Sequence, residues 1–210
     1  MDITHITSLL GGIALFLYGM SIMGAGLEKL AGGKMQGVLQ KLTSPFSFRE
    51  VSLQNGTIQD CRGCSYTACL HFAQRHTCFY GGAISTEIIP AIENCDAMLF
   101  LCPNYNDAVS ANIMALFNRL TNLLTQRDLY DKYLFGIVVS GYSGSDLVAQ
   151  QLMGAMCFNK TTMLPPRFCL MQTAHDPDSA KNMPDIQERI QAFAANMESV
   201  LLGRGVKKTY

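Results

Sequence analysis

The sequence predicts an α/β protein in which a parallel sheet lies between two layers of helices. Two observations support this prediction. Short apolar runs such as 97–102 and 134–140 have the length and the Val, Ile, Leu and Phe content of strands buried on both faces. Between such runs, apolar residues recur at the three- and four-residue spacing of helices. Strands that alternate with helices are typical of βαβ units, which build parallel sheets.

The elements follow in order after residue 45. We expect strands near residues 49–54, 97–102, 134–140 and 167–174. We expect helices at about residues 84–94, 108–126, 145–156 and 184–202. Right-handed crossovers place the helices on both faces of such a sheet. The carboxyl ends of all its strands then meet at one rim, where open α/β sheets bind ligands.

Composition and charge exclude some classes of function. The chain has 210 residues, and its 16 basic and 16 acidic side chains balance. A basic surface for nucleic acid is therefore not expected. Eight cysteines without a cleavable signal pattern indicate a reducing compartment rather than a disulfide framework. These features predict a cytoplasmic protein.

Two strand-to-helix turns carry the most informative side chains. The first turn, residues 103–107, reads Pro-Asn-Tyr-Asn-Asp and follows the strand at 97–102. The second, residues 140–146, reads Ser-Gly-Tyr-Ser-Gly-Ser-Asp and follows the strand at 134–140. Each turn holds one tyrosine among small polar residues, and glycines permit close approach of the backbone. Such a rim suits a flat ring with a polar edge, such as a flavin. The alternative is two ordinary loops whose tyrosines serve as apolar plugs.

An uncharged segment at residues 9–27 precedes the predicted sheet. Its nineteen residues reach the minimum length of a membrane span. The basic residues Lys29, Lys34, Lys41 and Arg49 follow it, so the remainder of the chain would stay on the cytoplasmic side. The segment could thus anchor the protein at the inner face of the membrane. A buried core helix is the alternative.

Four cysteines cluster between residues 61 and 78. They are Cys61, Cys64, Cys69 and Cys78. Four thiolates can hold zinc or an iron–sulfur cluster. The spacing lacks the tight Cys-x2-Cys-x2-Cys form, however, and reduced thiols in a surface loop are the favoured interpretation. We therefore predict no bound metal here.

Residues 6–44 resemble the start of bacterial sodium/phosphate cotransporters. The matching words are "GGIALFLYGM", "GLEKLAG" and "LQKLT". The Gln-Ser-Ser substrate and ion motifs of that family do not occur in this chain. The resemblance therefore implies a membrane-protein fragment rather than a working transporter, because no midplane binding site is present.

Residues 48 to about 180 resemble flavodoxin-like NAD(P)H-dependent FMN oxidoreductases. The matching words are "DCRGC", "IIPAIENCDAMLFLCPNYNDAVSANIMALFNRL" and "VVSGYSGSD". The resemblance implies that the two turns wrap the isoalloxazine ring of FMN. The residues it assigns to the cofactor are Pro103, Asn104, Tyr105, Asn106, Ser110, Gly141, Tyr142, Ser143 and Gly144. It assigns no catalytic side chain.

The chain departs from that family before residue 48. Family members begin with a strand and a loop that binds the FMN phosphate, and no counterpart precedes Phe48. The chain therefore resembles a fusion of a helical segment, residues 1–44, with an incomplete flavodoxin-like domain, residues 45–210. A second copy in a homodimer could supply the missing strand.

The resemblance to the reductases leads to one functional expectation and two alternatives. We expect weakly bound FMN to pass electrons from NAD(P)H to a small-molecule acceptor, with the chemistry supplied by the flavin. The first alternative is a membrane-bound cotransporter fragment whose contact with the bilayer is made by residues 9–27. The second is an inactive fusion.

Overall fold

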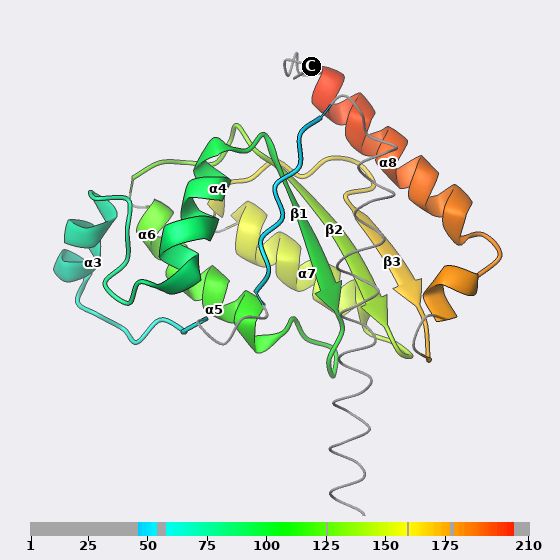
Figure 1. The fold of residues 1–210 in the computed structure, drawn as a ribbon, viewed down its shortest axis with the longest axis horizontal. Helices are drawn as coiled ribbons and strands as arrows, with labels where there is room; N and C mark the ends of the chain where they lie inside the picture. The colour runs from blue at the N-terminus through cyan, green and yellow to red at the C-terminus, as the bar shows by residue number, and fades with distance from the viewer. Residues whose placement is uncertain (1–45, 54–57, 125, 159, 177–178, 204–210) are drawn as a thin grey trace, which may run out of the picture.

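The computed structural model shows a three-stranded parallel sheet with helices on both faces (Figure 1). It describes residues 46–53, 58–124, 126–158, 160–176 and 179–203. The strands are β1 (Ala97–Pro103), β2 (Tyr133–Ser140) and β3 (Cys169–Thr173), and they lie in that order. Three of the four predicted strands are therefore confirmed, as is the parallel arrangement.

The helices agree with the predicted pattern, and the described residues contain two further short helical segments. The segment α3 (Tyr66–Ala73), which the sequence did not predict, begins at Ser65, whose hydroxyl accepts a hydrogen bond from the Ala68 amide at 3.3 Å. The remaining elements are η2 (Ile84–Ile88), α4 (Ile89–Asn94), α5 (Ala111–Arg119), α6 (Thr121–Leu124), α7 (Ser145–Met153), η3 (Gly154–Phe158), η4 (Ser179–Asn182) and α8 (Ile186–Gly203). The four predicted helices thus all occur, three of them divided into shorter pieces.

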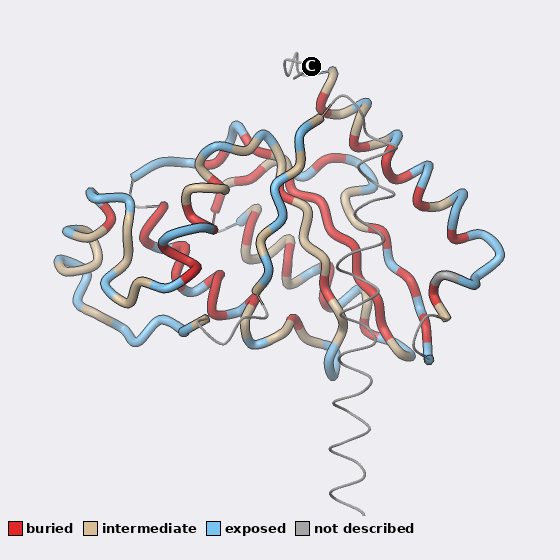
Figure 2. Tube along the Cα trace, in the orientation of Figure 1, coloured by how far each residue is buried: buried red, intermediate tan, exposed pale blue. Residues whose placement is uncertain are grey.

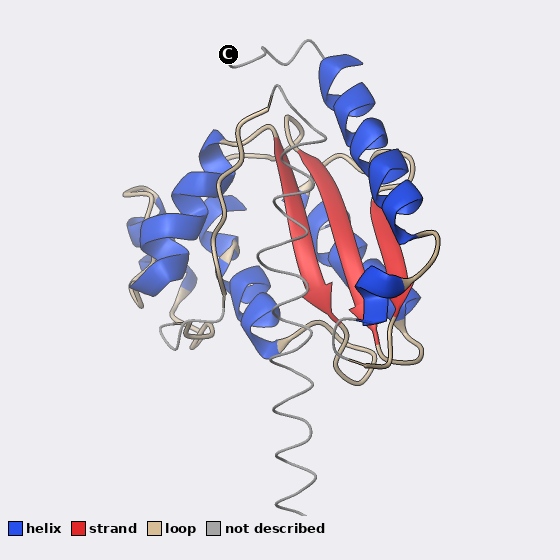
Figure 3. Cartoon of the chain, turned by 45° about the vertical axis from the view of Figure 1, so that its right-hand side comes forward, coloured by secondary structure: helices blue, strands red, loops and turns tan. Residues whose placement is uncertain are grey.

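Two apolar cores lie on opposite faces of the sheet. In one core, Met98 and Cys102 of β1 and Leu134 and Val138 of β2 pack against α4, α5 and α7. In the other core, the intervening strand residues, such as Phe135, point to the opposite face and pack against α8. This division follows from the two-residue repeat of a strand. Figure 2 shows that β2 is buried along nearly its whole length, as expected of the central strand, and Figure 3 shows the layers from a second direction.

The predicted strand at 49–54 is wrong for the residues that the structure describes. Residues 46–53 run beside the sheet in an extended form but belong to no strand (Figure 1). Val51 and Leu53 pack against the first core, and the Asn112 side chain donates to the Leu53 carbonyl at 2.5 Å. The apolar pattern of this segment therefore reflects its packing. An apolar pattern specifies which side chains are buried, but it does not show which strand, if any, the backbone pairs with.

The apolar segment 9–27 lies outside the described residues, as do the rest of residues 1–45. Within the part of the chain that is described, no helix has the length and apolar character needed to cross a bilayer. The predicted boundary between residues 44 and 45 lies outside the described residues and stays a prediction.

Two leucines of α7 provide a matched test of the first core. Leu152 is completely buried between the helix and the sheet, whereas Leu147 is 42% exposed. We expect Leu152→Ala to lower the free energy of unfolding by about 2–5 kcal/mol, because it removes buried methyl groups and leaves a cavity. Leu147→Ala should change it by less than ~1 kcal/mol. Chemical denaturation of both variants measures the difference, and equal losses would contradict this packing.

Candidate functional site

The first predicted turn continues directly from β1. The Asn104 amide donates to the Val139 carbonyl at 2.8 Å, which extends the pairing with β2 by one residue. The backbone then reverses, because Asn106 and Asp107 have positive φ angles of 55° and 59°. Asn and Asp tolerate this left-handed conformation better than other side chains with a Cβ atom. The turn therefore depends on the residue types found here.

A second set of contacts fixes the turn to the helices that follow. The Gln151 side chain accepts from the Val109 amide at 3.0 Å and donates to the Asp107 carbonyl at 3.1 Å. The Ser110 hydroxyl accepts from the Ile113 amide at 3.4 Å and thereby caps α5. Ser110 thus has a structural role in addition to the cofactor contact predicted for it. Gln151 was missed, since nothing in its local sequence points to residues 107 and 109.

The second predicted turn connects β2 to α7. The Ser140 and Ser145 hydroxyl groups are 2.5 Å apart, so a hydrogen bond closes the turn. Gly144, at the start of α7, has a φ of 79° and accepts from the Val148 amide at 3.1 Å. Gly141 faces open space. The turn therefore presents small residues and exposed backbone at the rim of the sheet.

The two turns are in direct contact. The Asn104 side-chain amide donates to the Ser143 carbonyl at 2.6 Å and approaches the Asp107 carboxylate at 3.4 Å. A Cβ atom added to Gly144 would overlap that carboxylate. The expectation that both turns lie at one rim of the sheet, at the carboxyl ends of β1 and β2, is therefore confirmed.

The two tyrosines differ in their surroundings. Tyr142 is 85% exposed, and its ring lies 6.1 Å from the ring of His175. Tyr105 is 38% exposed and forms a short antiparallel bridge with Ala108. Tyr142 is therefore free to receive a flat ligand. The plug interpretation does not describe its side chain.

One polar atom at this contact has no partner. The Asn104 side-chain oxygen is buried and accepts no hydrogen bond from the described residues. Leaving such an acceptor unpaired costs about 1–3 kcal/mol, so a ligand that donates to it would be stabilised. The imide N–H of a flavin ring is a donor of this kind. The residues at the rim therefore fit the flavin that the sequence predicted.

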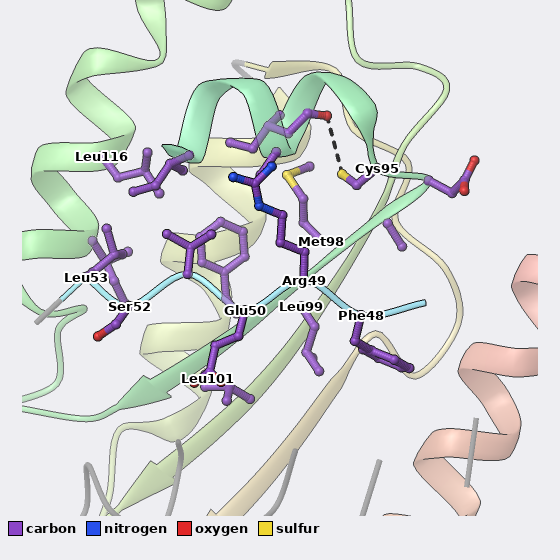
Figure 4. Close-up of a pocket in the computed structure, with 18 of the residues that line it drawn as sticks. Phe48, Arg49, Glu50, Ser52, Leu53, Cys95, Met98, Leu99, Leu101 and Leu116 are labelled. Atoms are coloured by element: carbon purple, nitrogen blue, oxygen red, sulfur yellow. Dashed lines mark hydrogen bonds between the residues drawn. The ribbon is translucent and has the colours of Figure 1, made fainter. Parts of the chain in front are cut away.

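A groove of about 960 Å³ opens beside the first turn (Figure 4). Of the predicted cofactor residues, Pro103, Tyr105 and Ser110 line one end of it. The groove continues along β1 to Phe48 and Arg49. The second turn, residues 141–144, is not part of its lining. The structure thus brings the predicted residues to one rim without enclosing all of them in one cavity.

The four clustered cysteines surround a separate cavity. Cys61, Cys64, Cys69 and Cys78 line a space of about 200 Å³. Burial raises the pKa of the Cys69 thiol, and the neighbouring cysteines raise it further. Within the described chain, however, no group of three or more His, Cys, Asp or Glu side chains is placed to hold a metal ion.

Arg119 borders the same cavity and was missed by sequence reasoning. Its side chain is buried and donates to the Gly81 carbonyl at 2.7 Å and to the Ser85 hydroxyl at 3.0 Å. It also donates to the Gln59 carbonyl at 3.3 Å. These bonds join three segments around α5, so Arg119 organises the loop that carries the cysteines. The sequence gives no local signal for this role.

Comparisons with known proteins agree with the fold. The family model of NADPH-dependent FMN reductase matches residues 36–176, about two thirds of the chain. The solved structure of RosB with a bound intermediate, 8-demethyl-8-formylriboflavin-5'-phosphate, superposes with a TM-score of 0.58 at 11% sequence identity. That match covers 84% of this chain and 76% of the RosB chain. No curated protein matches the sequence.

The chain therefore belongs to the NADPH-dependent FMN reductase family. Its fold is flavodoxin-like, and FMN and NAD(P)H are its cofactor and electron donor. The family match begins at residue 36, upstream of the boundary expected at residue 45. The cotransporter resemblance of residues 6–44 has no support in these comparisons.

Because the two turns are in contact, we expect Gly144 and Gly141 to differ in how well they tolerate substitution by alanine. Gly144→Ala should destabilise the protein, because a left-handed alanine costs about 1–2 kcal/mol and its Cβ would displace Asp107. Gly141→Ala should be nearly neutral, since no atom lies within 4 Å of an added Cβ. Thermal unfolding of the two variants measures this difference. A Gly141→Ala protein that is the less stable of the two would contradict the geometry.

Proposed function

We propose that the two contacting turns hold the FMN ring and that the bound flavin passes electrons from NAD(P)H to a small-molecule acceptor. The observation that supports this most directly is the buried and unpaired Asn104 oxygen, which lies where the two turns meet. The flavin supplies the hydride chemistry when it is bound. The residues of the chain bind the ring and fix its orientation.

Each part of the rim has a distinct task in this proposal. The Asn104 oxygen accepts a hydrogen bond from the ring, while its amide nitrogen stays committed to Ser143. Gly141 leaves space for the polar edge of the ring to approach the backbone. Tyr142 covers one face of the ring and excludes water from it. Tyr105, at the end of the groove, flanks the ring from β1.

No side chain is assigned as a proton donor or acceptor. Pro103, Asn106 and Ser110 shape the first turn and start α5, so they hold the ring indirectly through the backbone. Ser143 and Gly144 position Asn104 and Asp107. Catalysis then consists of placing the flavin between the electron donor and the acceptor.

The phosphate of FMN is expected to contribute little to the binding affinity. In this family the phosphate loop follows a first strand, and the sequence before Phe48 contains no counterpart of either. A phosphate that gains no charge-assisted hydrogen bonds remains in water. We therefore expect riboflavin to compete nearly as well as FMN, and a strong preference for FMN would show that a phosphate site exists.

Flavin titration of matched tyrosine variants tests the ring site. Tyr142→Ala should weaken FMN binding about tenfold, which corresponds to ~1.4 kcal/mol, because the ring loses its exposed aromatic partner. Tyr130→Ala is the control: Tyr130 is 62% exposed and precedes the amino end of β2, at the opposite rim. Quenching of flavin fluorescence gives both affinities.

The same titration distinguishes two ways in which the proposal could fail: the chain binds no flavin at all, or it binds flavin elsewhere. If FMN does not bind the full-length chain, the proposed function fails. If FMN binds and both tyrosine variants keep the affinity of the parent protein, flavin binding stands but its position at this rim is wrong. Consumption of NADPH in the presence of FMN then measures the reductase activity itself.

A further inference from the structure

The fold holds the four cysteines of residues 61–78 close together. Their thiols are free and line the same cavity. Arg119 of α5 donates to the Gln59 carbonyl before this segment and to the Gly81 carbonyl after it. The helix thereby fixes both ends of the segment, so the folded chain limits how far the cysteines can move apart.

Two of these cysteines, Cys64 and Cys69, lie at the start of α3. Cys64 directly precedes Ser65, the residue that caps the helix, and the Cys69 amide donates to the Ser65 carbonyl at 2.9 Å. Cys69 is therefore one helical turn beyond the cap. Because side chains on a helix lean towards its amino-terminal end, the Cys69 thiol leans back towards Cys64.

The thiols of Cys64 and Cys69 interact directly, and both are half-buried. Burial raises the pKa of the Cys69 thiol, and among the cysteines Cys64 raises it most, through its charge and through a hydrogen bond. A hydrogen bond raises the pKa of a thiol when it stabilises the protonated form, so the Cys69 thiol donates to the Cys64 sulfur. Cys61 and Cys78 act on Cys69 more weakly, through charge alone.

Two thiols in contact can exchange with a disulfide in two steps. The thiolate is the attacking form, so Cys69, which keeps its proton more firmly than an ordinary cysteine, is a poor first nucleophile. Cys64 is therefore the sulfur that attacks first, and Cys69 is the sulfur that completes the reaction. Disulfides of this kind are usually transient in a reducing compartment.

We propose that Cys64 and Cys69 form a redox-active dithiol that low-molecular-weight disulfides, such as oxidised glutathione, convert to a protein disulfide. The Cys64 thiolate attacks one sulfur of the reagent, which forms a mixed disulfide and releases one reduced thiol. The Cys69 sulfur then attacks Cys64, which forms the protein disulfide and releases the second reduced thiol. The two protons lost by the cysteines end on the released thiols, and the two electrons reduce the reagent. This assignment does not depend on flavin binding.

Tryptic mapping of the folded, full-length protein tests the pairing, because Arg62 and Arg75 separate the cysteines into different peptides. Residues 63–75 form a peptide whose only cysteines are Cys64 and Cys69. The protein is treated with oxidised glutathione, and the remaining thiols are then alkylated with iodoacetamide. This peptide should carry no alkyl group and should be lighter by two hydrogen atoms than its reduced form.

The other outcomes of the mapping would overturn the proposal. One is a peptide 63–75 in which both cysteines are alkylated, because the dithiol would then not react. Another is a cross-link from this peptide to residues 50–62, which carry Cys61, or to residues 76–119, which carry Cys78. A cross-link of either kind would show that a different pair of thiols is oxidised.

Cysteine variants test the order of the two steps. Cys69→Ser should retain glutathione on Cys64 as a stable mixed disulfide, because the second attack is lost. Cys61→Ser is the matched control: Cys61 is exposed, and its loss should leave the disulfide in peptide 63–75 unchanged. If Cys64→Ser retains glutathione on Cys69 as fast as Cys69→Ser retains it on Cys64, the proposed order of attack is wrong.

The contribution of the fold is measured by the same equilibrium in urea. At fixed ratios of oxidised to reduced glutathione, the equilibrium constant for the disulfide should be at least ~10-fold larger in the folded protein, because the fold holds the two sulfur atoms together. Equal constants would contradict the proposal, since closeness along the chain alone would then bring Cys64 and Cys69 together.

Discussion

The parallel pairing of β1 with β2 is the interaction on which the rest of the structure depends. Its register places Pro103 opposite Val139, so the two strands deliver their turns to the same point. Asn104 can then reach Ser143, thirty-nine residues further along the chain. A shift of one residue would reverse the faces of every β1 side chain and separate the turns. The geometry of the rim is therefore set by backbone pairing before any side chain of the site takes part.

A buried lysine holds this pairing in place at the opposite end. The Lys132 ammonium, just before β2, is almost completely buried and donates to the Glu93 carbonyl at 3.1 Å and to the Cys95 carbonyl at 2.7 Å. It also lies 3.4 Å from the Asp131 carboxylate. A buried ammonium is tolerated only with such partners. These contacts tie the chain that enters β1 to the chain that enters β2, so both strands start in register.

The sequence correctly predicted the features that depend on residues close together in the chain. The apolar runs of β1 and β2 and the small polar residues after them specify strands, turns and their common rim. The segment at 49–54 shows the limit of such reasoning, because an apolar pattern specifies burial and not a pairing partner. Gln151 and Arg119 show a second limit. Gln151 acts on Val109, forty-two residues away, and Arg119 acts on Gly81, thirty-eight residues away. The helix α3 is different, since its cap at Ser65 was a signal that could have been used.

The exposure of Tyr142 has a thermodynamic consequence for ligand binding. An aromatic ring that is 85% exposed in the free protein is surrounded by water. A flat ligand that covers the ring releases this water, and burial of apolar surface gives binding a negative change in heat capacity. The enthalpy of association then becomes more favourable as temperature rises, while its entropy becomes less so. The affinity itself changes less than either quantity, because the two changes largely compensate.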